Sequence, residues 1–202
     1  MKRSPKPDTL ANQIVAGGGS EPRAENDGDG ATPGGRADWP EPCGDFDIRI
    51  DRDGRWFYHG SPINRMALVK LFASVLRRDA DGAYWLVTPV EAVRVRVDET
   101  PFTAVALSAT GTGRTQVLTV RTNLDESVTI DAEHGIRLAA PDAEGARVPY
   151  VNVRDGLEAR VLRSVYYDLI ALGVDAAQEN DQIYGVWSAG CFFPLGTTNE
   201  NH

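Results

Sequence analysis

The clearest hydrophobic pattern in the chain lies in residues 48–76, where a period of two gives way to a period of three to four. Apolar and polar residues alternate in residues 48–50 and 56–58, on either side of Asp51-Arg52-Asp53-Gly54. Such alternation around an Asp-Gly pair is typical of two antiparallel strands joined by a tight turn, because glycine tolerates the positive φ that the turn needs. The pattern therefore predicts a β-hairpin.

The spacing changes after the loop His59-Gly60-Ser61-Pro62. From Asn64 onward, apolar residues recur on one helical face, which predicts an amphipathic helix packed on a sheet. The predicted face consists of Leu68, Leu71, Phe72, Val75 and Leu76. Ser61 or Asn64 is the expected cap, and Arg77-Arg78 are expected in the last turn, where cations complement the helix dipole.

Residues 84–97 predict two more strands, interrupted at Thr88-Pro89. In the second of these strands, valines at positions 93, 95 and 97 alternate with Arg94 and Arg96. This alternation predicts one buried face and one face in contact with solvent.

Short strand-like runs separated by turn residues follow residues 98–101. The predicted strands are Phe102–Ser108, Gln116–Thr122, Ser127–Ile130, Gly135–Leu138 and Val148–Val153. Serial short strands of this kind favour an antiparallel, strongly bent sheet.

The opening pattern then returns in residues 150–172, YVNVRDGLEARVLRSVYYDLIAL, where a strand precedes Arg-Asp-Gly and a helix follows. The predicted apolar face of that helix is Val161, Val165, Leu169 and Leu172. A strand-like segment, YGVWSAGCFFPL, comes next, as YWLVTP does after the first helix. We interpret the two stretches as copies of one sheet-plus-helix motif, that is, as an internal duplication.

The N-terminal residues 1–42 are rich in glycine and proline, and this composition buries too little apolar surface to offset chain entropy. Residues 1–38 are therefore expected to be disordered or loosely structured, with a short helical turn at Thr9–Val15. We predict an N-terminal β/α domain over 39–98, a C-terminal domain over 99–196 and a tail at 197–202.

Length and charge bound the class of protein. The 202 residues, 42% of them hydrophobic, suffice for one medium or two small domains. No apolar run is long enough to span a bilayer, and a cytoplasmic location is expected. The net charge of −8 disfavours nucleic acid polymers and acidic membranes as partners, although residues 43–97 alone have more basic than acidic groups.

Cys43 and Cys191 show no metal-type spacing and are expected to be separate reduced thiols.

Several segments together resemble a known family. They are CGDFDIRIDRDGRWFYHGSPINR, LVKLFASVLRR, LVTPVE, PFTAVAL, RTN, YVNVRDGLEAR and VWSAGCFFPL. In this order, from about Trp39 to Leu195, they resemble the bacterial domain-of-unknown-function family numbered 1285. The resemblance implies an α+β protein of two β-rich domains, the C-terminal one a pleckstrin-homology-like bent antiparallel sheet capped by a helix. It also implies no established enzymatic activity, a ligand site between the domains, for which a nucleotide-like molecule is one candidate, and a role in signalling.

The residues themselves offer a possible anion site. Arg65, Arg154 and Arg160 occur at loop-to-helix junctions of the two copies, and guanidinium groups bind phosphate or carboxylate bidentately. Trp56 and Trp187 would offer a face for a base, although buried aromatic residues are more often part of the core. Glu91 and Glu158 would face these arginines, and structural salt bridges are the simpler interpretation of both.

Other polar residues are weaker candidates. Asn123 suits a turn or recognition of a ligand edge, and His134 has no partner at metal-type spacing. Ser188 lies outside a Gly-x-Ser-x-Gly elbow, and Gly111-Thr112-Gly113 has no helix after it, so a strand end and a hairpin turn are predicted there. No catalytic or metal-binding residue and no cofactor is predicted. The predicted ligand-binding set is Trp56, Arg65, Glu91, Asn123, His134, Arg154, Glu158, Arg160 and Trp187.

Three functions remain open from the sequence. The first is a non-enzymatic binding or sensor protein that takes a small anionic ligand, such as a nucleotide, between its domains. The second is a protein interaction scaffold without a small ligand, which an exposed apolar patch would favour. The third is a hydrolase that uses His134 or Glu91, which would need a carboxylate of raised pKa in a pocket.

Overall fold

The first sheet belongs to the N-terminal of two units, residues 1–101 and 102–202, into which the chain divides. The computed structural model describes residues 12, 39–40, 42, 46–140, 147–178 and 181–197, without the side chains of 177, 178, 181, 182 and 197. The predictions for residues 1–38 and for the tail 197–202 fall, apart from Asn12 and Thr197, outside the described residues. The domain boundary predicted after Asp98 lies a few residues before the division at Pro101.

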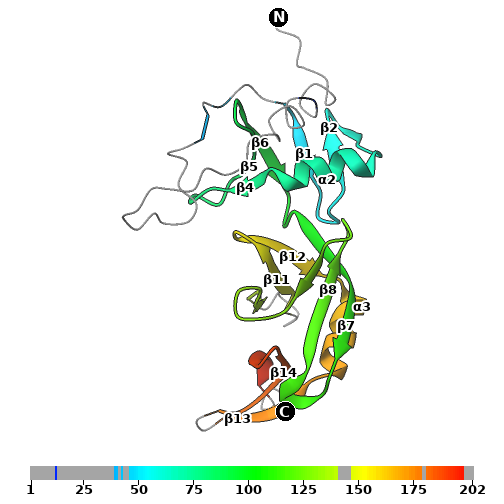
Figure 1. The fold of residues 1–202 in the computed structure, drawn as a ribbon, viewed down its shortest axis with the longest axis vertical. Coiled ribbons are helices and arrows are strands. Elements are labelled where there is room, and N and C mark those ends of the chain that lie inside the picture. The colour runs from blue at the N-terminus through cyan, green and yellow to red at the C-terminus, as the bar shows by residue number, and fades with distance from the viewer. Residues whose placement is uncertain are drawn as a thin grey trace, which may run out of the picture. The chain divides into compact units, whose positions relative to one another are not determined.

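The N-terminal unit contains a six-stranded sheet in the order β3-β2-β1-β6-β5-β4 (Figure 1). Its strands are β1 (Ile48–Ile50), β2 (Trp56–Tyr58), β3 (Ser61–Pro62), β4 (Leu76–Arg78), β5 (Tyr84–Val87) and β6 (Ala92–Val97). All neighbours pair antiparallel except β1 and β6, which are parallel. The predicted β1–β2 hairpin and the predicted interruption between β5 and β6 are therefore present.

Local hydrogen bonds explain the first hairpin. The backbone N–H groups of Asp53 and Arg55 both donate to Oδ1 of Asp51, each at 2.9 Å. Gly54 has a φ of +75°, which a residue with a Cβ rarely adopts. Ile48 and Tyr58 are register partners, as are Ile50 and Trp56, so Ile50 and Trp56 are buried together on one face.

Helix α2 (Met66–Ser74) packs on the buried face of this sheet, as predicted, but it is shorter than predicted. Phe72 is fully buried, and its ring centroid lies 6.1 Å from that of Trp56. Arg65 is the N-cap residue and no side chain caps the helix, so the predicted caps Ser61 and Asn64 are wrong.

The C-terminal end of α2 also differs from the prediction. Leu76, Arg77 and Arg78 form β4, and Leu76 pairs with Leu86 of β5. Leu76 is fully buried in this strand. Its apolar character therefore reflects burial, which a helix and a strand satisfy equally, and the pairing with β5 decides between them.

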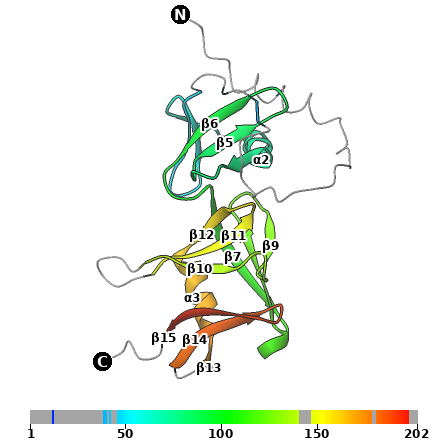
Figure 2. The same ribbon diagram turned by 90° about the vertical axis from the view of Figure 1, so that its left-hand side faces the viewer.

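The C-terminal unit contains a second six-stranded sheet, in the order β10-β11-β12-β7-β8-β9 (Figures 1 and 2). Its strands are β7 (Phe102–Thr110), β8 (Val117–Thr122), β9 (Ser127–Thr129), β10 (Ile136–Leu138), β11 (Pro149–Arg154) and β12 (Leu157–Val161). A 3-10 turn, η1 (Gly113–Thr115), joins β7 to β8. The predicted strands of this region are confirmed to within two residues, and β12 is an additional one. The sheet is not wholly antiparallel as predicted, because β12 pairs in parallel with β7.

Val161 lies in β12 and not in the helix to which it was assigned, because it pairs in parallel with Ala104 of β7. Helix α3 (Arg163–Ala171) follows and buries Val165 and Leu169. Within the described residues, a three-stranded sheet of β13 (Val174–Gln178), β14 (Asp181–Ser188) and β15 (Cys191–Thr197) completes the unit. Cys191 is a free thiol there, and Cys43 lies outside the described residues.

Both six-stranded sheets share one strand order. In each, the first and last strands in the sequence pair in parallel at the centre, β1 with β6 and β7 with β12. This order makes β1 equivalent to β7, whereas the repeat predicted from the sequence makes β1 equivalent to β11. The duplication and the pleckstrin likeness stay predictions, and the architecture observed is a β-rich α+β fold.

Candidate functional site

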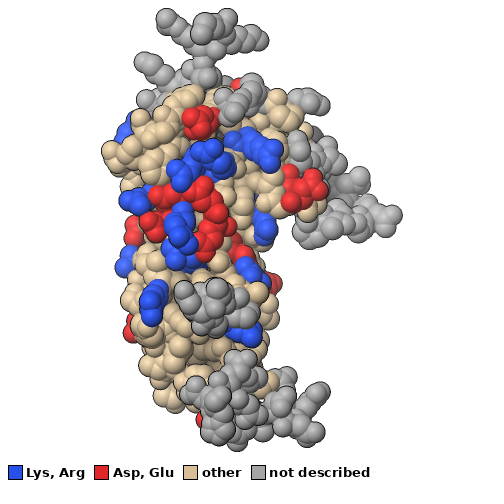
Figure 3. Space-filling view, turned by 180° about the vertical axis from the view of Figure 1, so that it is seen from behind, with Lys and Arg blue, Asp and Glu red and all other residues tan. Residues whose placement is uncertain are grey.

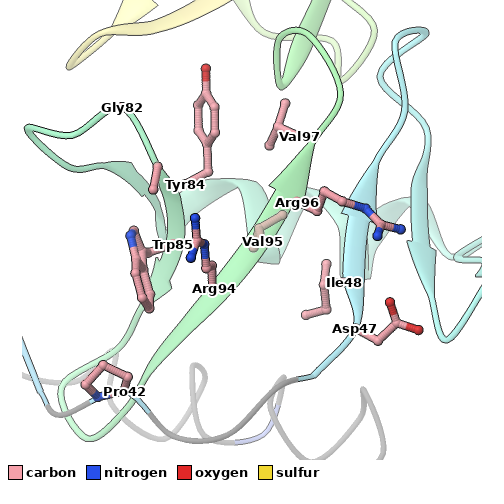
Figure 4. A pocket seen from close by; sticks show the side chains of 11 residues that line it. Pro42, Asp47, Ile48, Gly82, Tyr84, Trp85, Arg94, Val95, Arg96 and Val97 are labelled. Atoms are coloured by element: carbon pink, nitrogen blue, oxygen red, sulfur yellow. The ribbon is translucent and has the colours of Figure 1, made fainter.

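A hollow of about 680 Å³ lies on the open face of the first sheet. Strand β6 forms its floor, with Val93 and Val95 buried and Arg94 and Arg96 exposed. The two arginines therefore extend from the same face of one strand (Figure 4). The hollow is lined by Pro42, Asp47, Ile48, Gly82, Ala83, Tyr84, Trp85, Arg94, Val95, Arg96 and Val97.

Strand register brings an indole ring next to the first arginine. Trp85 of β5 is the register partner of Arg94, and the guanidinium carbon of Arg94 lies 5.9 Å from the centroid of the Trp85 ring. Trp85 also contacts the ring of Trp39 in an edge-to-face arrangement, with 6.5 Å between the ring centroids. Trp85 is only 7% exposed, so it forms a fixed wall of the hollow.

A single buried carboxylate shapes the neighbouring turn. Asp79 accepts hydrogen bonds from the backbone N–H of Ala83 and from Nε1 of Trp85, both at 2.8 Å. Gly82 has a φ of +83°, a conformation that favours glycine. The turn therefore presents two small residues, Gly82 and Ala83, beside the tryptophan wall.

The two arginines of the hollow have no hydrogen bond or ion pair with any residue that the structure describes. Their neighbour Arg49, the register partner of Arg96, donates to both carboxylate oxygens of Asp98, at 3.0 and 3.1 Å from Nε. This hydrogen bonding by Arg49 is the main reason that the pKa of Asp98 is lowered, and the charge of Arg96 contributes less. Asp98 is thus already satisfied, and the charges of Arg94 and Arg96 are available to a ligand.

Other arginines of the surface are paired with acidic groups, and Figure 3 shows basic and acidic side chains next to one another on one face of the molecule. In the N-terminal unit, for example, Arg55 donates to Asp51 at 3.1 Å and to Asp53 at 2.8 Å. A guanidinium group that is already paired with a carboxylate would have to give up that partner to bind an incoming anion. Arg94 and Arg96 differ from them in this respect.

One acidic residue stands at the opposite rim of the hollow. Figure 4 shows Asp47 on the side of Arg96, and Trp85 on the side of Arg94. Asp47 has a φ of +45°, and its carbonyl accepts a hydrogen bond from the backbone N–H of His59 at 3.1 Å. The hollow therefore offers two cations at its centre, an apolar wall at one end and a carboxylate at the other.

The residues that the sequence predicted for a site are divided between the units. Trp56 belongs to the core of the N-terminal unit and is 2% exposed. Arg65 accepts the first backbone hydrogen bonds of α2 through its carbonyl oxygen, from the N–H groups of Leu68 and Val69. Glu91 lies in the turn between β5 and β6, where its backbone bonds with Thr88.

In the C-terminal unit, two predicted residues form ion pairs with partners that were not foreseen. Arg154 binds both oxygens of Glu126, at 2.6 Å for the first, and its guanidinium carbon lies 5.2 Å from the centroid of Phe102. Glu158 accepts two 2.8 Å hydrogen bonds from Arg137. Glu158 was expected to face an arginine, and its contact with Arg137 is a structural salt bridge.

The other predicted residues of this unit also have structural contacts. Asn123 exchanges hydrogen bonds with the backbone of Thr103. Asp131 accepts from the backbone N–H of His134 and lies 3.0 Å from its Nδ1. Arg160 is half-buried in β12 and pairs in register with Tyr150. Trp187 contacts the guanidinium carbon of Arg114, 4.9 Å from its ring centroid, and the tilted ring of Phe192, 5.2 Å between centroids.

The assignment of these residues to a ligand site stays a prediction.

Ser188 is the strand-end residue that the sequence predicted: it is fully buried and hydrogen-bonded to backbone groups. Within the part of the chain that is described, no cluster of three or more His, Cys, Asp or Glu could hold a metal ion. No helix among the described residues is long and apolar enough to cross a membrane.

Arg94 and Arg96 were not among the ligand-binding residues predicted from the sequence, although the sequence contains the pattern that exposes them. The valine–arginine alternation placed both on the open face of β6. The same pattern is typical of an ordinary solvated strand. What distinguishes this face is the neighbouring strand: Trp85 opposite Arg94 and the turn at Gly82.

Comparison with known proteins supports the family resemblance. Residues 37–100 match the N-terminal domain of DUF1285, described as a domain of unknown function, and residues 101–195 match the C-terminal domain of the same family, described as a protein of unknown function. The chain belongs to the DUF1285 family. No protein in a search of curated proteins matches it significantly.

Two crystal structures of DUF1285 family proteins are similar to the chain. One, from Silicibacter pomeroyi DSS-3, is 46% identical, with 84% of this chain and 92% of that chain covered and a TM-score of 0.73. The other, from Shewanella baltica OS155, is 28% identical, with 61% of this chain and 90% of that chain covered and a TM-score of 0.49. The family descriptions assign no activity.

Proposed function

We propose that this DUF1285 protein is a non-enzymatic binding or sensor protein for a small anionic ligand, a nucleotide being one candidate, with a role in cytoplasmic signal transduction. The anion binds in the hollow on the first sheet. A single observation supports this proposal: Arg94 and Arg96 share the open face of β6, and neither has a hydrogen bond or ion pair with a described residue. The hypothesis from the sequence places the ligand between the domains, whereas this proposal needs only the N-terminal unit.

Electrostatics favour an anion at this position. Alternate residues of a strand are roughly 7 Å apart, so the two positive charges of Arg94 and Arg96 repel each other. An anion between them replaces repulsion by two attractions. Guanidinium groups also bind phosphate and carboxylate in a planar, bidentate manner, which adds directionality to the attraction.

Non-enzymatic binding is the simplest chemistry for such a lining. Catalysis by acyl or phosphoryl transfer needs an activated nucleophile next to a base. Among the described residues that line the hollow, the titratable groups besides the arginines are Asp47 and Tyr84. Tyr84 lies on the side of Arg94, away from Asp47 (Figure 4).

The test is thermal stabilisation of the full chain by a panel of anions at low ionic strength, with inorganic phosphate, citrate and AMP as probes. At least one probe should raise the melting temperature of the wild type, and Arg94→Met and Arg96→Met should each remove most of that shift. Arg121→Met is the matched control, because Arg121 is exposed on β8 and bonded to Asp125. It changes the net charge equally and should keep the shift.

A wild type that no probe stabilises would contradict the proposal, and so would arginine variants that keep the full shift. In either case the interaction scaffold becomes the better hypothesis. Its support is the contact of Trp187 with Arg114 and with Phe192, in which both rings are partly exposed. Partly exposed aromatic residues and arginine are enriched at protein interfaces.

The proposal also includes two statements about the origin of the fold. The first is an internal duplication in the form that the shared strand order of the two six-stranded sheets supports, with β1 equivalent to β7 and not to β11. The second is a pleckstrin-like C-terminal unit, supported by its antiparallel meanders and by α3, which follows β12. Superposition of β1–β6 on β7–β12 tests the first statement, since unrelated sheets would not align over all six strands.

A further inference from the structure

We infer that the ligand of the hollow is an aryl acid, with one planar apolar ring and one anionic group. The inference rests on the proposed function, because it describes the ligand of that same hollow. It follows from the difference between the two ends of the lining, which are apolar at Trp85 and acidic at Asp47.

The apolar end has a shape suited to a ring. Its lining residues Pro42, Ala83, Tyr84 and Trp85 offer no charge, and Gly82 and Ala83 have the smallest side chains in the hollow. A larger residue is strained at position 82, since the φ of Gly82 is +83°. The space beside Trp85 therefore remains open to a ligand.

Arg94 provides a surface as well as a charge at this end. Its guanidinium group lies over the Trp85 ring, and Trp85 is itself held by Asp79 and Trp39. A guanidinium group stacks on aromatic faces through its flat, weakly hydrated surface. A ligand ring on the outer face of Arg94 would complete a stack of ring, guanidinium and indole, while its acid group reaches Arg96.

Asp47 limits the ligand at the other end. Figure 4 shows its carboxylate on the side of Arg96. A second acid group on the ligand would approach that carboxylate, and like charges repel. The hollow should therefore prefer a ring with one acid group over a ring with an acid group at each end.

Calorimetric titration of the full chain at low ionic strength tests the ring. Phenyl phosphate should bind at least about tenfold more tightly than inorganic phosphate, because the ring buries apolar surface. Ala83→Leu fills the space beside Trp85 and should abolish this preference while phosphate binding persists. Equal affinity of the two probes for the wild type would overturn the inference and leave the proposed function intact. Absence of binding by both would instead contradict the proposed function.

A second pair of probes tests the acidic end. The wild type should bind benzoate more tightly than terephthalate, which has an acid group at each end of the ring. Asp47→Asn should remove or reverse this preference, and asparagine tolerates the positive φ of this position well. A wild type that prefers terephthalate, or a variant that keeps the preference for benzoate, would overturn the assignment of Asp47. Circular dichroism confirms that each variant is folded.

Discussion

The carboxylate of Asp79 accepts a 2.8 Å hydrogen bond from the indole nitrogen of Trp85. Its other oxygen accepts the backbone N–H of Ala83 at the same distance. Asp79 is 7% exposed, so one buried side chain fixes both the turn and the aromatic wall of the hollow. The geometry of the proposed site thus depends on a residue that does not line it.

Asp79→Ala should lower the free energy of unfolding by about 1–3 kcal/mol for each buried donor that loses its acceptor. Chemical denaturation monitored by tryptophan fluorescence measures the loss. Asp81→Ala is the control, because Asp81 is exposed in the same turn. Equal losses in the two variants would show that the Asp79 hydrogen bonds contribute nothing specific.

Phe72→Ala should cost about 3–5 kcal/mol, since the ring is fully buried against Trp56 and its removal leaves a cavity. Met66→Ala, at the exposed start of the same helix, should change the free energy of unfolding by less than about 0.5 kcal/mol. Urea denaturation compares the two. A Phe72→Ala loss below about 1 kcal/mol would mean that α2 contributes little to the core.

Ser188→Ala should lower the free energy of unfolding by about 1–3 kcal/mol, because two buried backbone groups lose their partner. The hydroxyl donates to the carbonyl of Ile130 at 2.5 Å and accepts from the N–H of Leu118 at 2.9 Å. Ser127→Ala, exposed on edge strand β9, is the control and should be nearly neutral. A neutral Ser188→Ala would show that β14 does not depend on this hydroxyl to pack on β8 and on Ile130, the residue after β9.

Asp131 should make stability depend on pH in the acid range. The backbone N–H of His134 first, and then its side chain and the N–H of Glu133, hold the pKa of Asp131 below its usual value. A lowered folded-state pKa stabilises the native state above the usual pKa of about 3.8, and this contribution disappears as the pH falls through the folded-state value. The stability difference between wild type and Asp131→Asn should therefore be largest near neutral pH and vanish in acid. Denaturation curves from pH 7 to pH 2.5 measure it, and a constant difference would contradict the assignment.

Local patterns predicted most strands of this protein correctly. The hairpin of Ile48 and Trp56 follows from alternation around an Asp-Gly turn, and the strands from Phe102 to Arg154 follow from short apolar runs between turn residues. In each case the information lies within a few residues, because alternation and turn chemistry are local properties.

The errors occurred where a local pattern fits two structures. Leu76 and Val161 both fit a helical face, yet each lies in a strand, paired with Leu86 and Ala104 respectively. Burial requires an apolar side chain in either conformation, so the residue type alone does not decide. The distant strand that supplies the hydrogen bonds does.

The sequence by itself therefore determined most of the strands and turns, and the alternation that exposes Arg94 and Arg96. Tertiary structure alone decided that Trp85 faces Arg94, that Asp98 is bonded to Arg49, and that both arginines of β6 line one hollow. The physical reason is that a charge becomes available for a ligand only when its neighbours in space have other partners. Those neighbours come from strands far apart in the sequence, and strand register brings them together.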